Sequence, residues 1–252
     1  YYSYNLWVEA FNEANAFFGE NKIDEAIELY RVSSLFLPEE SRSYEALARL
    51  YFSKSDFINA KKNANKALSI NANIADLWSI KGSIANQGND QILAEEMFRK
   101  AYDVALENKE SIDNLAAHMT RLFEILFEND KKSEALLLSE RLIEIDPENI
   151  LFYSNAGSVY QQVYNDYVDV AFNAYNNLRT LNEMELENLK TQFEDCINFA
   201  QKARENFLMC SELELNEENS EMYYKESKGL KSKIKEINRI IKDINKKLDE
   251  SE

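Results

Sequence analysis

Apolar residues in the C-terminal third of the chain recur every three or four positions, which is the spacing of one face of an α-helix. One such row follows Gly157, a second starts at Leu186 and a third at Leu230, with polar breaks near Asn182 and Asn216. We therefore predict three long helices, each of about 30 residues or roughly 45 Å, packed along coiled-coil-like seams. The predicted seam positions are Tyr160, Val163, Tyr167, Val170 and Ala174; Leu186, Leu189, Phe193, Cys196, Ala200, Ala203, Phe207 and Cys210; and Leu230, Ile234, Ile237, Ile241, Ile244 and Leu248.

Small residues in the rest of the chain recur with a period of 34 residues, as at Ala26, Ala60 and Ala94. A unit of that length holds two helices of about a dozen residues and two short turns. Small residues at fixed points let the two helices approach closely, and the pairs must stack because one pair cannot bury its apolar face alone. Two further series with the same period are Ala14, Ala48 and Gly82, and Ser33, Ala67 and Ala101.

These positions resemble the tetratricopeptide repeat (TPR) family, whose pattern places aromatic, small and large apolar residues at fixed points of a 34-residue unit. The best matching repeats contain Tyr44, Leu47, Ala48, Tyr51, Ala60 and Ala67, and Trp78, Gly82, Ala94, Phe98 and Ala101. A fourth contains Leu122, Ala135, Leu142 and Pro147, and a fifth opens with Tyr153, Ala156, Gly157 and Tyr160. The resemblance implies an all-α, right-handed α-solenoid of antiparallel helix pairs.

The resemblance also suggests the domain limits. Four repeats would cover residues 4–149, at about 7–39, 41–74, 75–110 and 111–149, followed by an elongated fifth repeat at 150–215 and a capping helix at 216–252. The fourth repeat comes seven residues late, and because seven residues make about two helical turns, they can lengthen helices without turning the apolar face. Ser111 is the predicted N-cap of its first helix. The layout resembles bacterial TPR proteins with an elongated final repeat and a terminal helix.

Composition agrees with a helical protein, since the 252 residues include only two prolines and five glycines. The net charge of −16 disfavours nucleic acid as a partner, which also counts against a repeat protein that reads RNA bases. No apolar run approaches the length of a membrane span. The chain begins at Tyr1 rather than Met, from which we expect an upstream segment. Together with the resemblance to bacterial TPR proteins, this favours an exported, periplasmic protein over a cytoplasmic one.

The sequence contains no recognisable catalytic or metal-binding motif, and we predict that the protein is not an enzyme. Its one histidine, His118, has no Cys or His at metal-ligand spacing, and we interpret it as packed or solvated. Cys196 and Cys210 lie on a predicted seam, where thiols pack as small apolar groups. No phosphate-binding loop, dinucleotide-binding turn, zinc-protease motif or nucleophile elbow occurs. We therefore predict no catalytic residues, no metal and no cofactor.

The resemblance implies that the first helix of each repeat lines a concave groove that binds a peptide or helix of a partner protein. Eight residues at family positions that point into the groove are the candidate site, and side chains that merely pack or face solvent remain the alternative for them. They are Asn15, Phe18, Arg49, Phe52, Ser83, Asn86, Phe127 and Gln161. Of the side chains with which TPR co-chaperones hold a C-terminal carboxylate, only Asn15 is present. Phe11, Asp76 and Ile80 occupy the positions of the cations, and Ala46 occupies that of a second asparagine, so we reject this function.

The last predicted helix differs in charge from the rest of the chain. Between Lys225 and Leu248 there are nine Lys or Arg and three Asp or Glu, a net charge of +6, so the remaining residues carry −22 of the total of −16. The simpler interpretation is a solvated cap on the last repeat. The alternatives are a homodimer through the long C-terminal helices or docking to an acidic surface, but Ile240 is the only apolar residue beside the main seam.

Overall fold

The computed structural model describes residues 2–176 and 181–250, and these residues form eleven helices and no strand. The prediction of an all-α protein is therefore confirmed. The chain divides into two compact units, Tyr1–Ile125 (unit 1) and Leu126–Glu252 (unit 2). The division falls inside helix α7 (Ile112–Glu128).

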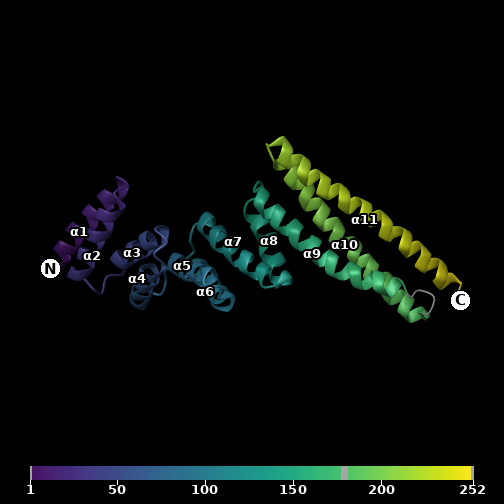
Figure 1. Ribbon diagram of the computed structural model, residues 1–252, viewed down its shortest axis with the longest axis horizontal. Coiled ribbons are helices and arrows are strands. Elements are labelled where there is room, and N and C mark those ends of the chain that lie inside the picture. Colours follow the sequence, from purple (N-terminus) through teal and green to yellow (C-terminus); the bar gives the residue numbers. More distant parts are fainter. Residues whose placement is uncertain (1, 177–180, 251–252) are drawn as a thin grey trace. The chain divides into compact units, whose positions relative to one another are not determined.

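Unit 1 contains three pairs of helices and most of α7, and Figure 1 labels these helices along the chain. In each pair the two helices run antiparallel and contact each other, and α2 contacts α3 as α4 contacts α5. The repeated alanines Ala14, Ala26, Ala48, Ala60 and Ala94 are completely buried, as expected for close helix contacts. The pairs are α1 (Tyr2–Gly19) and α2 (Ile23–Phe36), α3 (Ser41–Ser53) and α4 (Phe57–Ile70), and α5 (Ala75–Gln87) and α6 (Gln91–Glu107).

The turn inside each of these pairs also follows the repeat. Asn21, Ser55 and Asn89 all have left-handed backbone, with φ between 58° and 61°, which ends the first helix sharply. In the second and third pairs the next residue, Asp56 or Asp90, accepts a backbone N–H of the following helix at 3.1 Å. The left-handed residue that ends the first helix is therefore followed directly by the N-cap residue of the second helix.

The seven extra residues between the third and fourth repeats lie in helices. Helix α6 has 17 residues where α4 has 14, and α7 has 17 where α5 has 13. The connections before α5 and before α7 are equally long. Ser111 precedes α7, and its hydroxyl accepts the N–H of Asn114 at 3.4 Å, as expected for the predicted N-cap.

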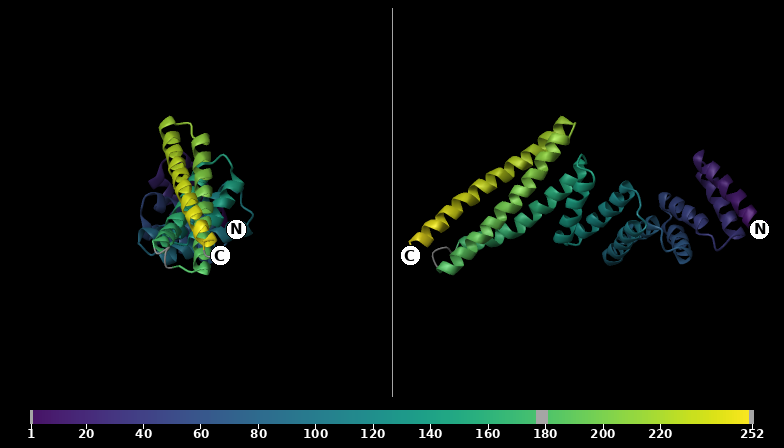
Figure 2. Two further views of the ribbon diagram at one scale, coloured as in Figure 1. Left: turned by 90° about the vertical axis from the view of Figure 1, so that its right-hand side faces the viewer. Right: turned by 180° about the vertical axis from the view of Figure 1, so that it is seen from behind.

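Unit 2 contains α8 (Lys132–Ile145) and three long helices, α9 (Ile150–Tyr175), α10 (Glu183–Leu213) and α11 (Glu217–Asp249). Helix α10 lies between α9 and α11 and contacts both along its length (Figure 2). All eight predicted seam positions of α10 are buried, including Cys196 and Cys210, which are free thiols. Helix α10 begins with a capping box between Asn182 and Glu185.

The predicted seam of α9 is wrong after Tyr160. The buried row runs through Tyr160, Tyr164, Val168 and Ala171, whereas Tyr167 and Val170 are 49% and 61% exposed. Val163 and Ala174 are half-buried. The reason is that α9 carries apolar residues on two neighbouring faces, and spacing alone does not indicate which one α10 covers.

In α11 the predicted seam is covered within the chain. Leu230, Ile237 and Ile244 are buried, and the remaining seam residues pack half-buried against the core of unit 2. Ile240, expected beside the seam, is buried in the same core. From Leu230 onward the apolar side chains of α11 are therefore used within one chain, against α9 and α10, whereas Met222 and Tyr224 near its start are about half exposed.

Two glycines explain how closely the paired helices approach. A Cβ added to Gly82 of α5 would lie 2.8 Å from the ring of Phe98 in α6. The equivalent Gly157 of α9 would place a Cβ 2.9 Å from the ring of Phe207 in α10. Because ordinary carbon contacts are about 3.5–4.0 Å, neither position has room for a side chain. The elongated pair α9–α10 thus keeps the glycine–phenylalanine contact of a normal repeat.

Candidate partner-binding pockets

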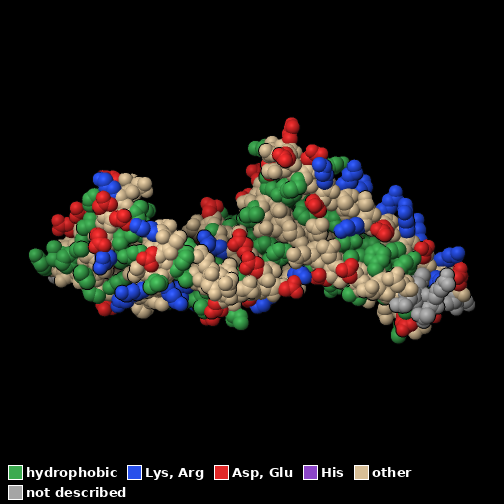
Figure 3. Space-filling view, in the orientation of Figure 1, with side chains coloured by type: hydrophobic (Ala, Val, Ile, Leu, Met, Phe, Trp, Pro, Cys, Tyr) green, Lys and Arg blue, Asp and Glu red, His purple; other side chains and the backbone are tan. Residues whose placement is uncertain are grey.

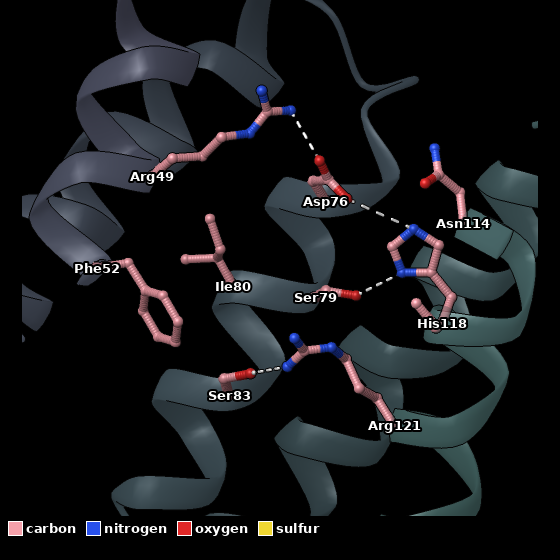
Figure 4. A pocket seen from close by; sticks show the side chains of 10 residues that line it. Arg49, Phe52, Asp76, Ser79, Ile80, Ser83, Asn114, His118 and Arg121 are labelled. Carbon is pink, nitrogen blue, oxygen red and sulfur yellow. Dashed lines mark hydrogen bonds and ion pairs between the residues drawn. The ribbon is translucent and has the colours of Figure 1, made fainter. Parts of the chain in front are cut away.

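The first helices of unit 1 form a pocket of about 230 Å³, which we call the α3/α5/α7 pocket (Figure 4). Its side chains come from positions spaced three, four or seven residues apart on each helix, so each helix contributes one face. The lining residues are Arg49 and Phe52 of α3, Asp76, Ser79, Ile80 and Ser83 of α5, and Asn114, Ala117, His118 and Arg121 of α7.

One wall of this pocket is a chain of polar contacts across the three helices. Arg49 donates to Asp76 with an Nη2–Oδ2 distance of 2.9 Å, which ties α3 to α5. The other carboxylate oxygen of Asp76 lies 3.6 Å from Nε2 of His118. Nδ1 of His118 lies 2.8 Å from the hydroxyl of Ser79, which ties α5 to α7.

His118 lies at the centre of this series of polar contacts, and its side chain is buried, with only 4% exposed. Nε2 has no hydrogen-bond partner among the described residues and faces two carboxylates, Asp76 and Glu110, at 3.6 and 3.8 Å. Burial lowers the pKa of His118 below 6.5, against the two carboxylates that raise it, and Arg121 lowers it further. The ring is therefore neutral at pH 7, and Nδ1 shares one hydrogen bond with the hydroxyl of Ser79.

Arg121 supplies the second guanidinium of the pocket. It is exposed, and its Nη1 donates to Ser83 at 3.2 Å. Because Asp76 already balances the charge of Arg49, and His118 is neutral, the lining residues carry a net charge of +1. This charge is opposite in sign to the net charge of −16 of the whole chain, although the carboxylate of Glu110 lies just outside the lining, 3.8 Å from Nε2 of His118.

A second pocket of about 330 Å³, the α1/α3 pocket, adjoins the first because Arg49 lines both. Phe11, Phe18 and Leu50 make its lining mainly apolar. The exposed Asn15 lies here too; its Oδ1 accepts a hydrogen bond from Tyr30 at 2.6 Å, and its amide N–H groups take no part in this bond. Phe18 is 52% exposed, a large apolar area that is not used for packing. The other lining residues are Arg42, Glu45 and Ala46.

The structure places five of the eight predicted groove residues on these two pockets: Asn15, Phe18, Arg49, Phe52 and Ser83. Phe52 is half-buried, and its ring also packs against Phe57, with centroids 5.9 Å apart. The other three predicted residues are not among the lining residues. Asn86 is half-buried on α5, Phe127 is half-buried on α7, and Gln161 of α9 donates to Glu226 of α11 at 3.4 Å.

Sequence reasoning did not assign Ser79, His118 or Arg121 to the pocket. Their helical spacing was readable, since His118 and Arg121 are three residues apart on α7. What the sequence does not contain is the pairing of α5 with α7, which brings Ser79 and His118 into contact across 39 positions. A lone histidine on an apolar face gives no sign of such a partner.

The arrangement of the helices matches solved tetratricopeptide-repeat structures. YrrB, described as a TPR protein with an unusual peptide-binding site, superposes with a TM-score of 0.54 at 18% identity, over 78% of this chain and 84% of that one. MamA superposes with a TM-score of 0.57 at 15% identity, over 84% and 97%. PilF of Pseudomonas aeruginosa gives 0.53 at 14%, over 91% and 99%. This chain therefore has the tetratricopeptide-repeat fold.

Comparison by sequence adds no closer assignment, since no protein-family model and no curated protein matches the chain. Across residues 2–176 and 181–250, no three or more His, Cys, Asp or Glu side chains are grouped so as to hold a metal ion. None of the helices formed by these residues combines the length and apolarity of a membrane span.

Proposed function

We propose that the protein is an interaction scaffold whose unit 1 binds an extended segment of a partner protein across α1, α3, α5 and α7. The observation that carries the proposal is the pair of adjoining pockets that share Arg49. Both are lined mainly by apolar surface, but the α1/α3 pocket adds the exposed ring of Phe18 and the α3/α5/α7 pocket adds the guanidinium of Arg121. A single extended segment can therefore place two different side chains in them. The peptide-binding site named for YrrB, which has the same fold, supports this function.

The two pockets favour different side chains of the bound segment. The α1/α3 pocket suits a large apolar side chain, because Phe18 and Leu50 can cover it. The α3/α5/α7 pocket suits Asp or Glu, because Arg121 has donors left over after its bond to Ser83. Asn15 presents amide donors to the backbone carbonyls of the segment. The partner segment is thus an apolar residue followed or preceded by an acidic one.

The test is selection of a phage-displayed library of random peptides against the full chain, followed by affinity measurement of the selected peptides. We expect an apolar–acidic pattern among them. Arg121→Ala should weaken binding about tenfold, the loss of one charge-assisted contact. Phe18→Ala should also weaken binding, by removing the exposed ring from the apolar pocket.

The control variants change exposed side chains on second helices, away from both pockets. Lys62→Ala on α4 removes a positive charge, and Leu35→Ala on α2 removes an apolar side chain that is 77% exposed. Both should bind the selected peptides as the unchanged chain does. The proposal fails if Phe18→Ala and Arg121→Ala bind them as tightly as the controls do.

A further inference from the structure

Helix α11 carries a row of six cationic residues along its outer face. The steps between them are three, four, four, three and four residues, so they lie in one line roughly 140° around the helix from the buried row. The row is about 27 Å long. All six side chains are exposed, and Figure 3 shows basic side chains along the outer edge of α11. They are Lys228, Lys231, Lys235, Arg239, Lys242 and Lys246.

The row is not balanced by acidic groups of the described chain. Only Lys246 has an ion-pair partner there, Glu250 at 3.8 Å. The three acidic residues of this segment lie toward α9 instead: Glu226 accepts from Gln161, Asp243 accepts from Tyr175, and Glu236 helps to raise the pKa of Tyr164. These three acidic side chains therefore form no ion pair with the cationic row, whereas Lys233, outside the row, lies over the ring of Tyr164.

Such a row destabilises the helix that carries it. Like charges three or four residues apart repel each other, and the favourable field of a helix end reaches only the last turn, where Lys246 and Lys247 lie. Capping of the last repeat needs the buried face of α11, not a particular charge on the outer face. The unpaired row is thus unexplained by the fold of the chain itself.

We propose that this row docks an acidic α-helix of a partner protein, lying alongside α11. A helix with Asp or Glu every three or four residues repeats its charges with the same rise as the row, as the flanking charges of paired helices do. A helix is also only about 10–12 Å wide, so it can contact the row alone. It thereby avoids repulsion by the rest of the chain, which carries a charge of −22. The proposal is independent of the peptide pockets of unit 1.

Two other polyanions fit the row less well. A lipid surface is bound by helices that insert apolar side chains, but the large apolar residues of α11 beyond Tyr224 are covered by the chain. Nucleic acid extends well past a single line of cations, and the acidic remainder of the protein would repel it. The charge pattern therefore favours a narrow acidic partner.

The probe for the test is a synthetic helical peptide of about five turns with Glu at steps of three and four residues, and its twin with Gln in place of Glu. Binding to the full chain is followed by fluorescence anisotropy. We expect the Glu peptide to bind and the Gln peptide to fail. Affinity should fall sharply between about 0.15 and 1 M salt, because screening then shortens from about 8 to 3 Å.

Two charge-matched variants locate the site. The row variant carries Lys231→Gln, Lys235→Gln and Lys242→Gln, and should bind the Glu peptide about tenfold more weakly. The control variant carries Lys61→Gln, Lys62→Gln and Lys100→Gln, three exposed lysines of unit 1, and should bind as the unchanged chain does. Circular dichroism of all three proteins establishes that their helices are intact.

Several outcomes would overturn the proposal. Equal binding by the row variant, or an equal loss in the control variant, would show that the row is not the site. Row-dependent binding to phosphatidylserine vesicles or duplex DNA, with none to the Glu peptide, would assign the row to a lipid or a nucleic acid instead. Row-dependent self-association without peptide binding would assign it to a second copy of this chain.

Discussion

The contact between Gly157 and Phe207 makes a stability prediction with a built-in control. Gly157→Ala adds one methyl group to the middle of α9, where the new Cβ would lie 2.9 Å from the Phe207 ring. Gly229→Ala adds the same methyl group to the middle of α11, where nothing lies within 4 Å of it. Both glycines are in unit 2, and both have negative φ, so the backbone accepts alanine at either position.

The magnitude follows from two opposing effects. Alanine is more favourable than glycine inside a helix by about 1 kcal/mol, and both variants gain this amount. Only Gly157→Ala pays the cost of overpacking, about 1–3 kcal/mol, because the buried ring must move by roughly 1 Å to restore a normal contact. We expect Gly229→Ala to raise the free energy of unfolding by about 1 kcal/mol, and Gly157→Ala to lie about 1–3 kcal/mol below it.

The assay is urea unfolding followed by far-ultraviolet circular dichroism, with both variants measured beside the unchanged chain. Phe207→Leu tests the cause, because a smaller side chain should remove most of the penalty when it is combined with Gly157→Ala. The equivalent change in unit 1, Gly82→Ala against Phe98, should behave like Gly157→Ala. If Gly157→Ala stabilises the chain as much as Gly229→Ala does, the close contact does not hold the pair together.

Three further predictions concern buried polar groups. Ser43→Ala should lower the free energy of unfolding by about 1–3 kcal/mol in urea titrations, because the buried indole N–H of Trp7, which donates to Ser43 at 2.9 Å, loses its acceptor. An unchanged free energy of unfolding would mean that water replaces the hydroxyl. Because burial lowers the pKa of His118 below 6.5, the folded state binds its proton less readily than the unfolded state, so stability should fall as pH drops below about 6.5. His118→Gln should remove that part of the pH profile, and an unchanged profile would contradict the assignment. Burial raises the pKa of Cys196 to about 11 and of Cys210 to about 12, so both thiols should resist iodoacetamide at pH 8 until urea unfolds the chain, and rapid labelling of the native protein would refute their burial.

The helix pairs were predictable because the sequence repeats the contacts that form them. Small residues recur wherever two helices touch, and Gly82 and Gly157 share one repeat position because each faces a phenylalanine. The all-α fold, the lengthened helices and the buried thiols follow from such local rules. The left-handed residues Asn21, Ser55 and Asn89 also share one position, but asparagine and serine are common in many kinds of turn and do not mark it as clearly as repeated alanines do.

The site was predictable only as far as one helix determines it. Asn15, Arg49 and Ser83 lie on pockets because repeat position fixes which face of a first helix points inward. The bond of Ser79 to His118 depends on two helices of different repeats, and periodicity within either helix does not reveal it. Gln161 shows the opposite case: its repeat position points it inward, but the terminal helix supplies Glu226 as a partner.

The covering of α11 bears on the alternative that the long C-terminal helices form a dimer. A coiled-coil dimer needs an apolar row that its own chain leaves open. Here the core of unit 2 takes up that row, and Ile240, the one apolar residue beside it, is buried in the same core. Beyond Tyr224, what α11 leaves exposed is polar and includes its cationic row, and two identical cationic rows repel each other. The outer face of α11 therefore suits an acidic partner better than a second α11, and light scattering at rising salt separates the two, since screening would promote a pairing of like charges and weaken a pairing of opposite ones.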